Sequence, residues 1–268
     1  MRSKKVTFNN LSGEDLTGSI DLPLTGSADS FALFAHCFTC SSTLKAVDNI
    51  SRALTMKGIG VLRFDFTGLG QSKGEFKETN FSTNLQDLRC AYDFLRDNYE
   101  PPQLLIGHSL GGAAALHAAS MLPLVRAVST IGAPASPGHV RHLIEDEEEI
   151  KLKGQAKVNI GGRPFLIKEQ FLKDLEKNDT KKSISSLGKA LLILHSPQDS
   201  IVSIENAAEI YECAKHPKSF ITMDGADHLL GDEKDSLYVG QVIATWASRY
   251  ISSREEEKNG HQIGRAHV

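Results

Sequence analysis

The chain has 268 residues, of which 40% are hydrophobic, and its formal net charge is −3. A weakly acidic chain without a dense run of Lys and Arg is not typical of a nucleic-acid-binding protein. Residues 1–10 are polar where a secretory signal would be apolar, and no apolar run is long enough to cross a bilayer. Four cysteines do not make a disulfide framework in a chain of this length. We therefore expect a cytoplasmic protein with one large core that binds neither nucleic acid nor membrane.

Short apolar runs alternate with segments of helical periodicity along most of the chain. Strands are predicted at residues 4–9, 16–22, 31–35, 59–66, 104–106, 127–131, 190–195 and 220–223. Helices are predicted at about residues 42–57, 81–99, 113–121, 204–214 and 235–251. The first two strands form an antiparallel hairpin, and the regular alternation that follows requires a parallel sheet with right-handed crossovers. We predict an α/β fold, with a mostly parallel, twisted sheet and helices on both faces, in one domain over residues 1–254.

The alternation stops at Gly132-Ala133-Pro134. From about residue 134 to about residue 188 the chain is polar, with an acidic run at 145–149. This segment also contains a predicted hairpin, at 156–159 and 164–167, and a predicted helix at 168–175. We interpret it as a small lid inserted into the domain.

Residues 255–268 are rich in charge and are predicted to be a disordered tail. The segment 263–268 is what a common sequencing adapter encodes when it is translated in one frame. We therefore expect the tail to be partly a sequencing scar and the natural chain to continue, with an ordinary disordered tail as the alternative. In either case these residues take no part in the fold argument.

A buried-strand pattern leads into Gly107-His108-Ser109-Leu110-Gly111, and an Ala-rich helical pattern follows. A serine at a sharp strand-to-helix turn has a strained backbone that exposes its hydroxyl, and the flanking glycines leave room for the close approach. The Gly-x-Ser-x-Gly spacing alone is weak evidence, and a Gly-rich turn is the alternative. The preceding strand, the following helix and the partners described next favour Ser109 as a nucleophile.

A serine hydroxyl needs a general base and a group that orients this base. A strand-to-helix turn that carries the nucleophile is called a nucleophile elbow. In hydrolases with such an elbow, the acid and then the histidine follow the serine along the chain. Asp199 follows the predicted strand 190–195, and His228 follows the strand 220–223. Both therefore lie at the carboxyl edge of the sheet, where Ser109 also emerges. We predict that Ser109, His228 and Asp199 form a catalytic triad.

Other residues compete for these roles. Asp224 and Asp227 are also acids near His228, but they precede it too closely in sequence to orient its ring easily. Three histidines also compete with His228. His108 is adjacent to the serine and is expected to point away from the site, His195 is expected to end a strand, and His117 to lie on a helix. For each of the three predicted triad residues, the alternative interpretation is a polar residue with a structural rather than a catalytic role. That alternative is weakened because all three arrive in order at strand ends.

The oxyanion hole of such a site needs two backbone N–H donors. Leu110, at the start of the helix, supplies one, and Phe38, in the loop after the strand 31–35, is the best candidate for the other. Asp65 precedes a Gly-bearing loop and is interpreted as a turn-stabilising residue rather than a catalyst. His139 and His142 lie near the acidic run, where a solvated lid face is favoured over a metal site. No metal and no organic cofactor is expected.

Cys37 and Cys40 form a C-x-x-C in the loop that should supply the Phe38 donor. In one interpretation, both are small apolar residues at tight positions. In the other, they are a redox pair, because C-x-x-C thiols can have a lowered pKa and can close into a disulfide. Closure would repack the backbone around Phe38 and tilt its N–H away from the oxyanion.

These residues resemble the α/β-hydrolase superfamily over about residues 4–252. The segments 36–40 and 63–70 are similar to the hydrolase half of bacterial proteins that fuse this fold to an OsmC-like peroxidase domain. The resemblance implies an α/β-hydrolase fold, and an OsmC-like domain in a longer natural chain. Two departures stand out. His36-Cys37 replaces the usual His-Gly before the oxyanion donor, and the loop that begins at Asp65 lacks the Arg of the common Asp-x-Arg-Gly motif.

The motif and the resemblance together predict a serine esterase that cleaves short-chain, small-molecule carboxylic esters through an acyl-enzyme on Ser109. The same triad serves thioesterases and peptidase-like acyl hydrolases, which are the alternatives among enzymes. A non-catalytic binding or regulatory module on this fold is a further alternative, but such a module would typically lack a triad member. Serine rather than aspartate at the elbow disfavours dehalogenase and epoxide hydrolase chemistry.

Overall fold

The computed structural model describes residues 1–37, 41–144, 147–160, 163–178 and 180–251. The strands are β1 (Arg2–Asn9), β2 (Asp15–Leu22), β3 (Ser30–Ala35), β4 (Ile59–Phe64), β5 (Leu104–His108), β6 (Ala127–Ile131), β7 (Gln155–Ile160), β8 (Arg163–Lys168), β9 (Ala190–His195) and β10 (Lys218–Thr222). The α-helices are α1 (Lys45–Thr55), α2 (Phe81–Asn98), α3 (Leu110–Ala118), α4 (Glu147–Lys153), α5 (Glu169–Lys177), α6 (Thr180–Ser185), α7 (Glu205–Cys213) and α8 (Glu233–Ala247). Short 3₁₀ turns lie at Phe76–Glu78, Ala119–Met121 and Pro137–Leu143.

Eight of these strands form one mixed sheet in the order β1-β2-β4-β3-β5-β6-β9-β10. β1 and β2 are an antiparallel hairpin, and β2 joins β4 in antiparallel register. The other six strands of this sheet, β4, β3, β5, β6, β9 and β10, are parallel to one another. Their carboxyl ends therefore all lie at the same edge. The chain moves from β3 to β4 on one side and then returns to β5 on the other. The strand order therefore reverses between β3 and β5, which is where sites form in open α/β sheets.

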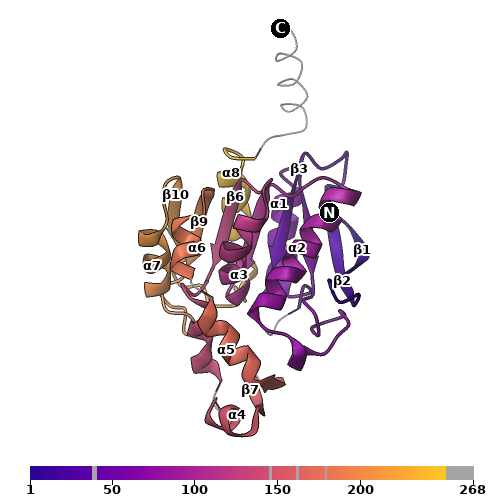
Figure 1. The fold of residues 1–268 in the computed structure, drawn as a ribbon. Helices are drawn as coiled ribbons and strands as arrows, with labels where there is room; N and C mark the ends of the chain where they lie inside the picture. Colours follow the sequence, from indigo (N-terminus) through magenta and orange to yellow (C-terminus); the bar gives the residue numbers. More distant parts are fainter. Residues whose placement is uncertain (38–40, 145–146, 161–162, 179, 252–268) are drawn as a thin grey trace, which may run out of the picture.

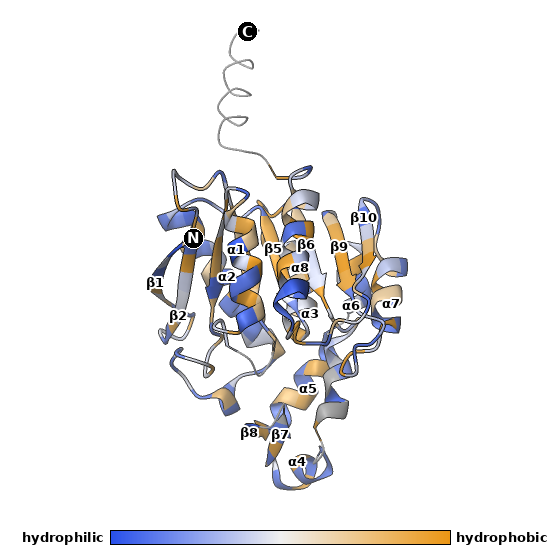
Figure 2. Ribbon diagram, turned by 180° about the vertical axis from the view of Figure 1, so that it is seen from behind, coloured by the Kyte–Doolittle hydropathy of each residue, from blue (hydrophilic) through white to orange (hydrophobic). Residues whose placement is uncertain are grey.

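The sheet is covered on both faces, as Figure 1 shows. α2, α3 and α7 pack on one face, and α1 and α8 pack together on the other. Side chains alternate between the faces along each buried strand: Leu33 and Leu105 enter the first core, Phe34 and Ile106 the second. β5 and β9 are among the most apolar segments of the ribbon (Figure 2). Full burial of one such side chain contributes roughly 1.5–3 kcal/mol. The predicted α/β fold is therefore confirmed.

The inserted segment extends below the carboxyl edge of the sheet and contains the separate β7–β8 hairpin. It is fastened to the main domain. The Asp174 carboxylate accepts hydrogen bonds from the N–H and the hydroxyl of Ser82, both at 2.7 Å, at the start of α2. The Phe165 and Phe76 rings lie 4.8 Å apart. Its buried apolar side chains also join the main core, among them Ile150, Val158, Ile167, Phe171 and Leu175.

Two helices of the insertion, α4 and α6, were not predicted from the sequence. α4 buries only Ile150, its second apolar residue, Leu152, is exposed, and the rest are charged, so it lacks the apolar periodicity on which a prediction depends. Its ion pairs at helical spacing, Glu147 with Lys151 at 2.7 Å and Glu149 with Lys153 at 2.9 Å, stabilise it only modestly. No helix in the described part of the chain is both long and apolar enough to cross a membrane.

Asp87 on α2 is a buried carboxylic acid, 2% exposed, next to the loop that follows β4. Its carboxylate accepts hydrogen bonds from the N–H and the hydroxyl of Thr67, at 2.9 and 3.0 Å. Burial raises the pKa of Asp87 from 3.8 to about 6, because it outweighs the opposite effect of these hydrogen bonds. Between these two pH values the native state holds a proton that the unfolded chain releases. Stability therefore falls as the pH rises through this window, by up to about 3 kcal/mol.

We expect Asp87→Asn, which keeps the shape without the charge, to remove this part of the pH dependence. Urea unfolding at about pH 4.5 and about pH 8 should show a smaller loss of stability in the variant than in the wild type. Asp97→Asn, at an exposed carboxylate on the same helix, serves as the control and should keep the wild-type loss. Equal losses in the wild type and in Asp87→Asn would show that Asp87 is ionised in the native state across the whole range.

Candidate active site

Ser109 lies at the turn between β5 and α3, at the carboxyl edge of the sheet. Its φ of +54° and ψ of −128° place a non-glycine residue in a sparsely populated backbone region, at a cost of about 1–3 kcal/mol. The surrounding backbone holds this conformation. The Ser109 N–H donates to the carbonyl of Ile131 at 2.8 Å, and the Ser109 carbonyl accepts from the Gly112 N–H at 2.8 Å. The strained turn that the motif predicted is present.

The glycines of the motif allow α3 to approach the strands closely. A Cβ on Gly107 would lie 2.3 Å from the carbonyl oxygen of Gly111. A Cβ on Gly111 would lie 2.4 Å from the carbonyl oxygens of Ala35 and His36, at the end of β3. Either side chain would therefore push the start of α3 away from the two strands that flank the switch point, and Ser109 with it.

His228 connects Ser109 to Asp199. Its Nε2 lies 3.0 Å from the Ser109 Oγ, and its Nδ1 lies 2.7 Å from the Asp199 Oδ2. An ionised carboxylate can only accept, so Nδ1 carries the proton and Nε2 is free to accept the serine hydroxyl. Asp199 comes from the loop after β9 and His228 from the loop after β10. The structure thus brings together the three residues that the sequence placed at separate strand ends.

Asp199 is held as a carboxylate. Its Oδ1 accepts the backbone N–H groups of Ile201 and Val202, both at 2.9 Å. Burial alone would raise the pKa of Asp199, but the hydrogen bonds from His228 and from these N–H groups hold the pKa below its ordinary value of 3.8. Asp199 is therefore ionised at neutral pH. It can orient the His228 ring and stabilise its cationic form without taking up the proton.

The competing acid Asp227 has other contacts. The Asp227 Oδ1 accepts the N–H groups of Leu229, at 2.8 Å, and Gly231, at 3.2 Å, and so shapes the loop that follows His228. The side chain that bonds to the His228 ring belongs to Asp199, as predicted.

The competing histidines also have defined partners. His195 ends β9, and its Nε2 donates to the carbonyl of Val202 at 2.7 Å. His117 lies on α3, and its Nε2 is 3.0 Å from the hydroxyl of Thr180 in the insertion. The expectation that His108 points away from the site is wrong, because its Nε2 donates to the backbone carbonyl of His228 at 2.7 Å.

Of the two predicted oxyanion donors, Leu110 is the first residue of α3. Its N–H belongs to the first helical turn, where amides lack intrahelical acceptors and the helix dipole is positive. Phe38 lies outside the described residues. Where the chain resumes, the Ser42 N–H donates to the Asp65 Oδ1 at 2.6 Å, and the Ser42 carbonyl accepts from Arg63 at 2.8 Å. The other oxygen of Asp65, Oδ2, accepts the Gln71 N–H at 2.9 Å in the Gly-bearing loop, which is the turn-stabilising contact predicted for it.

Cys37 is buried and disulfide-bonded. Cys40, its predicted partner, lies outside the described residues, and Cys90 and Cys213 are free. The redox gate on Phe38 stays a prediction. In the same structure Ser109, His228 and Asp199 are in hydrogen-bonding contact, so a disulfide at Cys37 is compatible with an assembled triad.

Gly132 is a site residue that the sequence marked only as the end of the strand–helix alternation. It follows β6 with a φ of +52°, and a Cβ there would lie 3.1 Å from the Asp199 Oδ2 and 3.4 Å from the His228 Nδ1. A glycine at this position leaves space for the acid–base pair. A glycine directly after a strand that neighbours the elbow strand is the signal that could have identified it.

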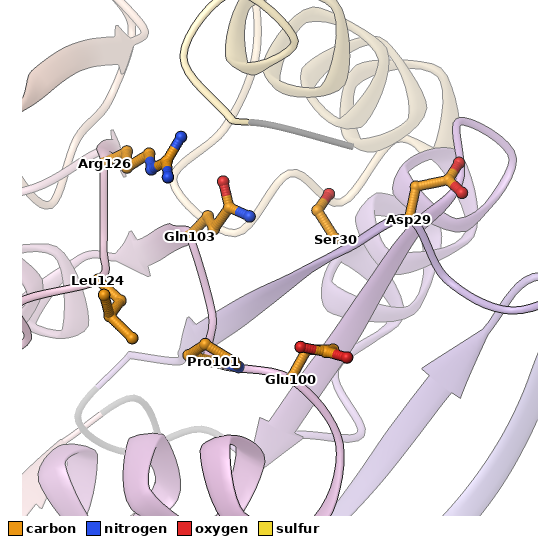
Figure 3. A pocket seen from close by; sticks show the side chains of 7 residues that line it. All are labelled: Asp29, Ser30, Glu100, Pro101, Gln103, Leu124 and Arg126. Atoms are coloured by element: carbon orange, nitrogen blue, oxygen red, sulfur yellow. The ribbon is translucent and has the colours of Figure 1, made fainter. Parts of the chain in front are cut away.

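A cavity of about 130 Å³ lies at the opposite edge of the sheet. Ser30, Gln103 and Arg126, at or just before the starts of β3, β5 and β6, line it together with Asp29 and Glu100 (Figure 3). It is separate from the Ser109 site. Within the described ranges, no group of three or more His, Cys, Asp or Glu side chains is arranged to hold a metal ion.

A serine on a strained strand-to-helix turn, bonded through a histidine to an aspartate from a later strand, defines an α/β hydrolase. The chain belongs to the α/β-hydrolase superfamily. The esterase domain of a Rhodothermus marinus protein, known from a crystal structure, is 52% identical; the match covers 93% of this chain and 99% of that chain, with a TM-score of 0.79. Residues 32–137 match the family described as serine aminopeptidase S33 (Hydrolase_4).

More distant relatives fit the same class. The mitochondrial palmitoyl-protein thioesterase ABHD10 of Mus musculus is 29% identical over 71% of this chain, and the match spans 65% of that protein's length, slightly less than two thirds. Est1E from Butyrivibrio proteoclasticus, solved with ferulic acid bound, shares the fold with a TM-score of 0.80 over 91% of this chain and 98% of its own, at 20% identity. The chain is thus an α/β hydrolase that is similar to proteins described as an esterase domain and as a thioesterase.

Proposed function

We propose that the protein is a serine esterase that hydrolyses short-chain carboxylic esters through an acyl-enzyme on Ser109. The observation that carries this proposal is the continuous hydrogen-bonded chain from Ser109 through His228 to Asp199, at 3.0 and 2.7 Å. A binding module on the same fold would not need an ionised Asp199 behind the histidine. The 52% identity to a protein described as an esterase domain supports the ester bond as the target.

In the first half of the reaction, the Ser109 Oγ attacks the ester carbonyl while the His228 Nε2 takes up its proton. The His228 ring becomes a cation, which the Asp199 carboxylate stabilises through the Nδ1–H. The carbonyl oxygen becomes an oxyanion, which the N–H groups of Leu110 and Phe38 stabilise. His228 then gives its proton to the leaving alkoxide, and Ser109 keeps the acyl group as an ester.

In the second half, a water molecule takes the place of the alcohol. The His228 Nε2 removes its proton, the hydroxide attacks the acyl carbonyl, and the same two N–H groups stabilise the second oxyanion. When the C–O bond to Ser109 breaks, His228 returns the proton to the Ser109 Oγ and the carboxylic acid leaves. Every proton passes through His228, so the chemistry needs no other acid or base.

The insertion supports the preference for short acyl chains. An interfacially activated lipase opens a lid with an amphipathic helix at a lipid surface, but this insertion is held to α2 through Asp174 and Ser82 and shares the main core. We expect kcat/KM on p-nitrophenyl esters to be highest at roughly two to six acyl carbons. The rate should not rise sharply when the substrate exceeds its solubility. A preference for emulsified long-chain triglycerides would contradict this expectation.

Thioester hydrolysis is the second candidate, favoured by the 29% identity to the mouse palmitoyl-protein thioesterase. Acyl thioesters and aryl esters of equal chain length distinguish the two, because the acyl group is constant and only the leaving group differs. The proposal predicts a higher kcat/KM for the esters and for short chains, whereas a maximum on palmitoyl thioesters would favour the second candidate. An aminoacyl p-nitroanilide in the same panel tests the peptidase-like alternative.

The resemblance to the hydrolase half of OsmC fusion proteins depends on the segments 36–40 and 63–70 alone. The relatives above support its hydrolase part, and the OsmC-like partner domain stays a prediction. The cytoplasmic location likewise stays a prediction from the N-terminal sequence.

A further inference from the structure

Two consecutive residues, the last of β5 and the one that follows it, contact His228 from different directions. The Ser109 Oγ lies 3.0 Å from the imidazole Nε2 of His228, and the His108 Nε2 donates to the main-chain carbonyl of His228 at 2.7 Å. The two imidazole rings lie with their centroids 5.2 Å apart. His108 itself is buried, only 3% exposed. One short segment of chain thus fixes both the backbone and the ring of the base.

The loop that carries Asp199 is also held by a histidine that donates to a main-chain carbonyl. His195 ends β9, is fully buried, and donates from Nε2 to the carbonyl of Val202 at 2.7 Å. The N–H of Val202 in turn donates to the Asp199 Oδ1 at 2.9 Å. Val202 therefore connects His195 to the carboxylate: a shift of its carbonyl would move the N–H that holds Asp199 in place.

Both rings are suited to this task because they are neutral. Burial, together with the nearby His228, lowers the pKa of His108 to about 3. Burial also lowers the pKa of His195. A neutral imidazole carries one N–H, and a carbonyl acceptor requires this N–H on Nε2 in each ring. A neutral ring also adds no positive charge next to His228, which must become a cation during the reaction.

We propose that His108 and His195 are positioning residues for the reaction, each donating an Nε2–H to a main-chain carbonyl of a loop that carries a triad member. This inference rests on the proposed function. Together the two hydrogen bonds set the distances between Ser109, His228 and Asp199. A displacement of a catalytic group by about 1 Å can lower turnover by about a hundredfold, so the loss of either bond should lower kcat more than it raises KM.

Two substitutions of nearly equal size separate the hydrogen bond from packing. His108→Gln keeps an N–H donor of similar reach, and His108→Met does not. We expect the Met variant to lose about 10- to 100-fold in kcat with little change in KM, and to react with a fluorophosphonate more slowly by a similar factor. The Gln variant should keep most of the wild-type kcat. His195→Gln and His195→Met should differ in the same way.

His117→Met provides the matched control. His117 is also a buried histidine on the elbow helix, but its Nε2 faces Thr180 of the insertion rather than a catalytic loop. This variant should lower the melting temperature and leave kcat near that of the wild type. If the Gln and Met variants at His108 lose kcat equally while both remain folded, the positioning role is overturned.

The wild-type protein gives a test that does not depend on a folded variant. Nitrogen-15 NMR of the imidazole groups should show His108 as a neutral Nε2–H tautomer from about pH 5 to about pH 8, and His195 as the same tautomer at about pH 7 to 8. An Nδ1–H tautomer or a cation at either residue within its pH range would contradict the proposal. This measurement also separates the two claims: a wild type that hydrolyses no acyl substrate would refute the proposed function, whereas the tautomers report on the positioning residues alone.

Discussion

Replacement of Ser109 by alanine is expected to lower kcat on a short-chain aryl ester by about 10⁴-fold or more. The attacking oxygen is lost, and His228 then has no hydroxyl to deprotonate. Fold and stability should change little, because alanine meets the same φ of +54° and the only described partner of the Ser109 Oγ is the His228 ring. Steady-state assays with a thermal unfolding curve for each protein test this directly.

A matched control is available on the same chain. Ser42→Ala removes a buried serine hydroxyl outside the triad, and the backbone groups of Ser42 that bond to Asp65 and Arg63 are retained. Its activity should stay near that of the wild type. Turnover by Ser109→Ala at a rate close to that of the wild type would show that another group attacks the ester.

Asp199→Asn is expected to lower kcat by about 10³- to 10⁴-fold, a severe effect but milder than that of Ser109→Ala. An asparagine can donate an N–H towards the His228 Nδ1 and so favour the wrong tautomer, with the proton on Nε2, where it cannot accept the serine proton. The N–H groups of Ile201 and Val202 would still bond to an amide oxygen, so the loop should keep its shape. Because the folded state lowers the pKa of Asp199, its carboxylate also adds stability above its ordinary pKa that is lost as the pH falls through the lowered value.

Asp224→Asn and Asp227→Asn are the controls for this assignment. Asp227 accepts the N–H groups of Leu229 and Gly231, and an asparagine oxygen can replace it there. Both control variants should keep most of the wild-type kcat. If either of them were slower than Asp199→Asn, the acid would be misassigned.

The sequence was sufficient to predict those features that depend on a local pattern of residue types. Apolar strands alternating with helices predicted the sheet, and the spacing around Ser109 predicted the elbow. Chain order and strand ends then predicted Asp199 and His228, which lie 29 residues apart in sequence and 2.7 Å apart in space. The structure brings these residues into contact, and each could be predicted because it depends on a residue type at a defined place in a βα unit; their catalytic roles stay predictions.

Contacts between distant loops were beyond the reach of the sequence. His108 was expected to point away, yet its partner is a main-chain carbonyl, which carries no sequence signal at all. Gly132 likewise lies beside Asp199 and His228, which are far away in the chain. Arg63 donates to the carbonyl of Ser42, in an earlier loop. The helix α4 is stabilised by packing of Ile150 and by ion pairs rather than by an apolar stripe, so its periodicity was too weak to predict.

In the proposed mechanism the acyl group passes through Ser109. The most direct measurement mixes the wild-type enzyme with p-nitrophenyl butyrate, quenches the reaction in acid during the first turnovers, and maps the acylated peptide by mass spectrometry. We predict a burst of p-nitrophenol that approaches one equivalent per enzyme and a single butyrylated residue, Ser109, which is absent in Ser109→Ala. Acylation at another residue, or turnover without any acylated peptide under conditions where a burst is seen, would show that Ser109 is not the nucleophile.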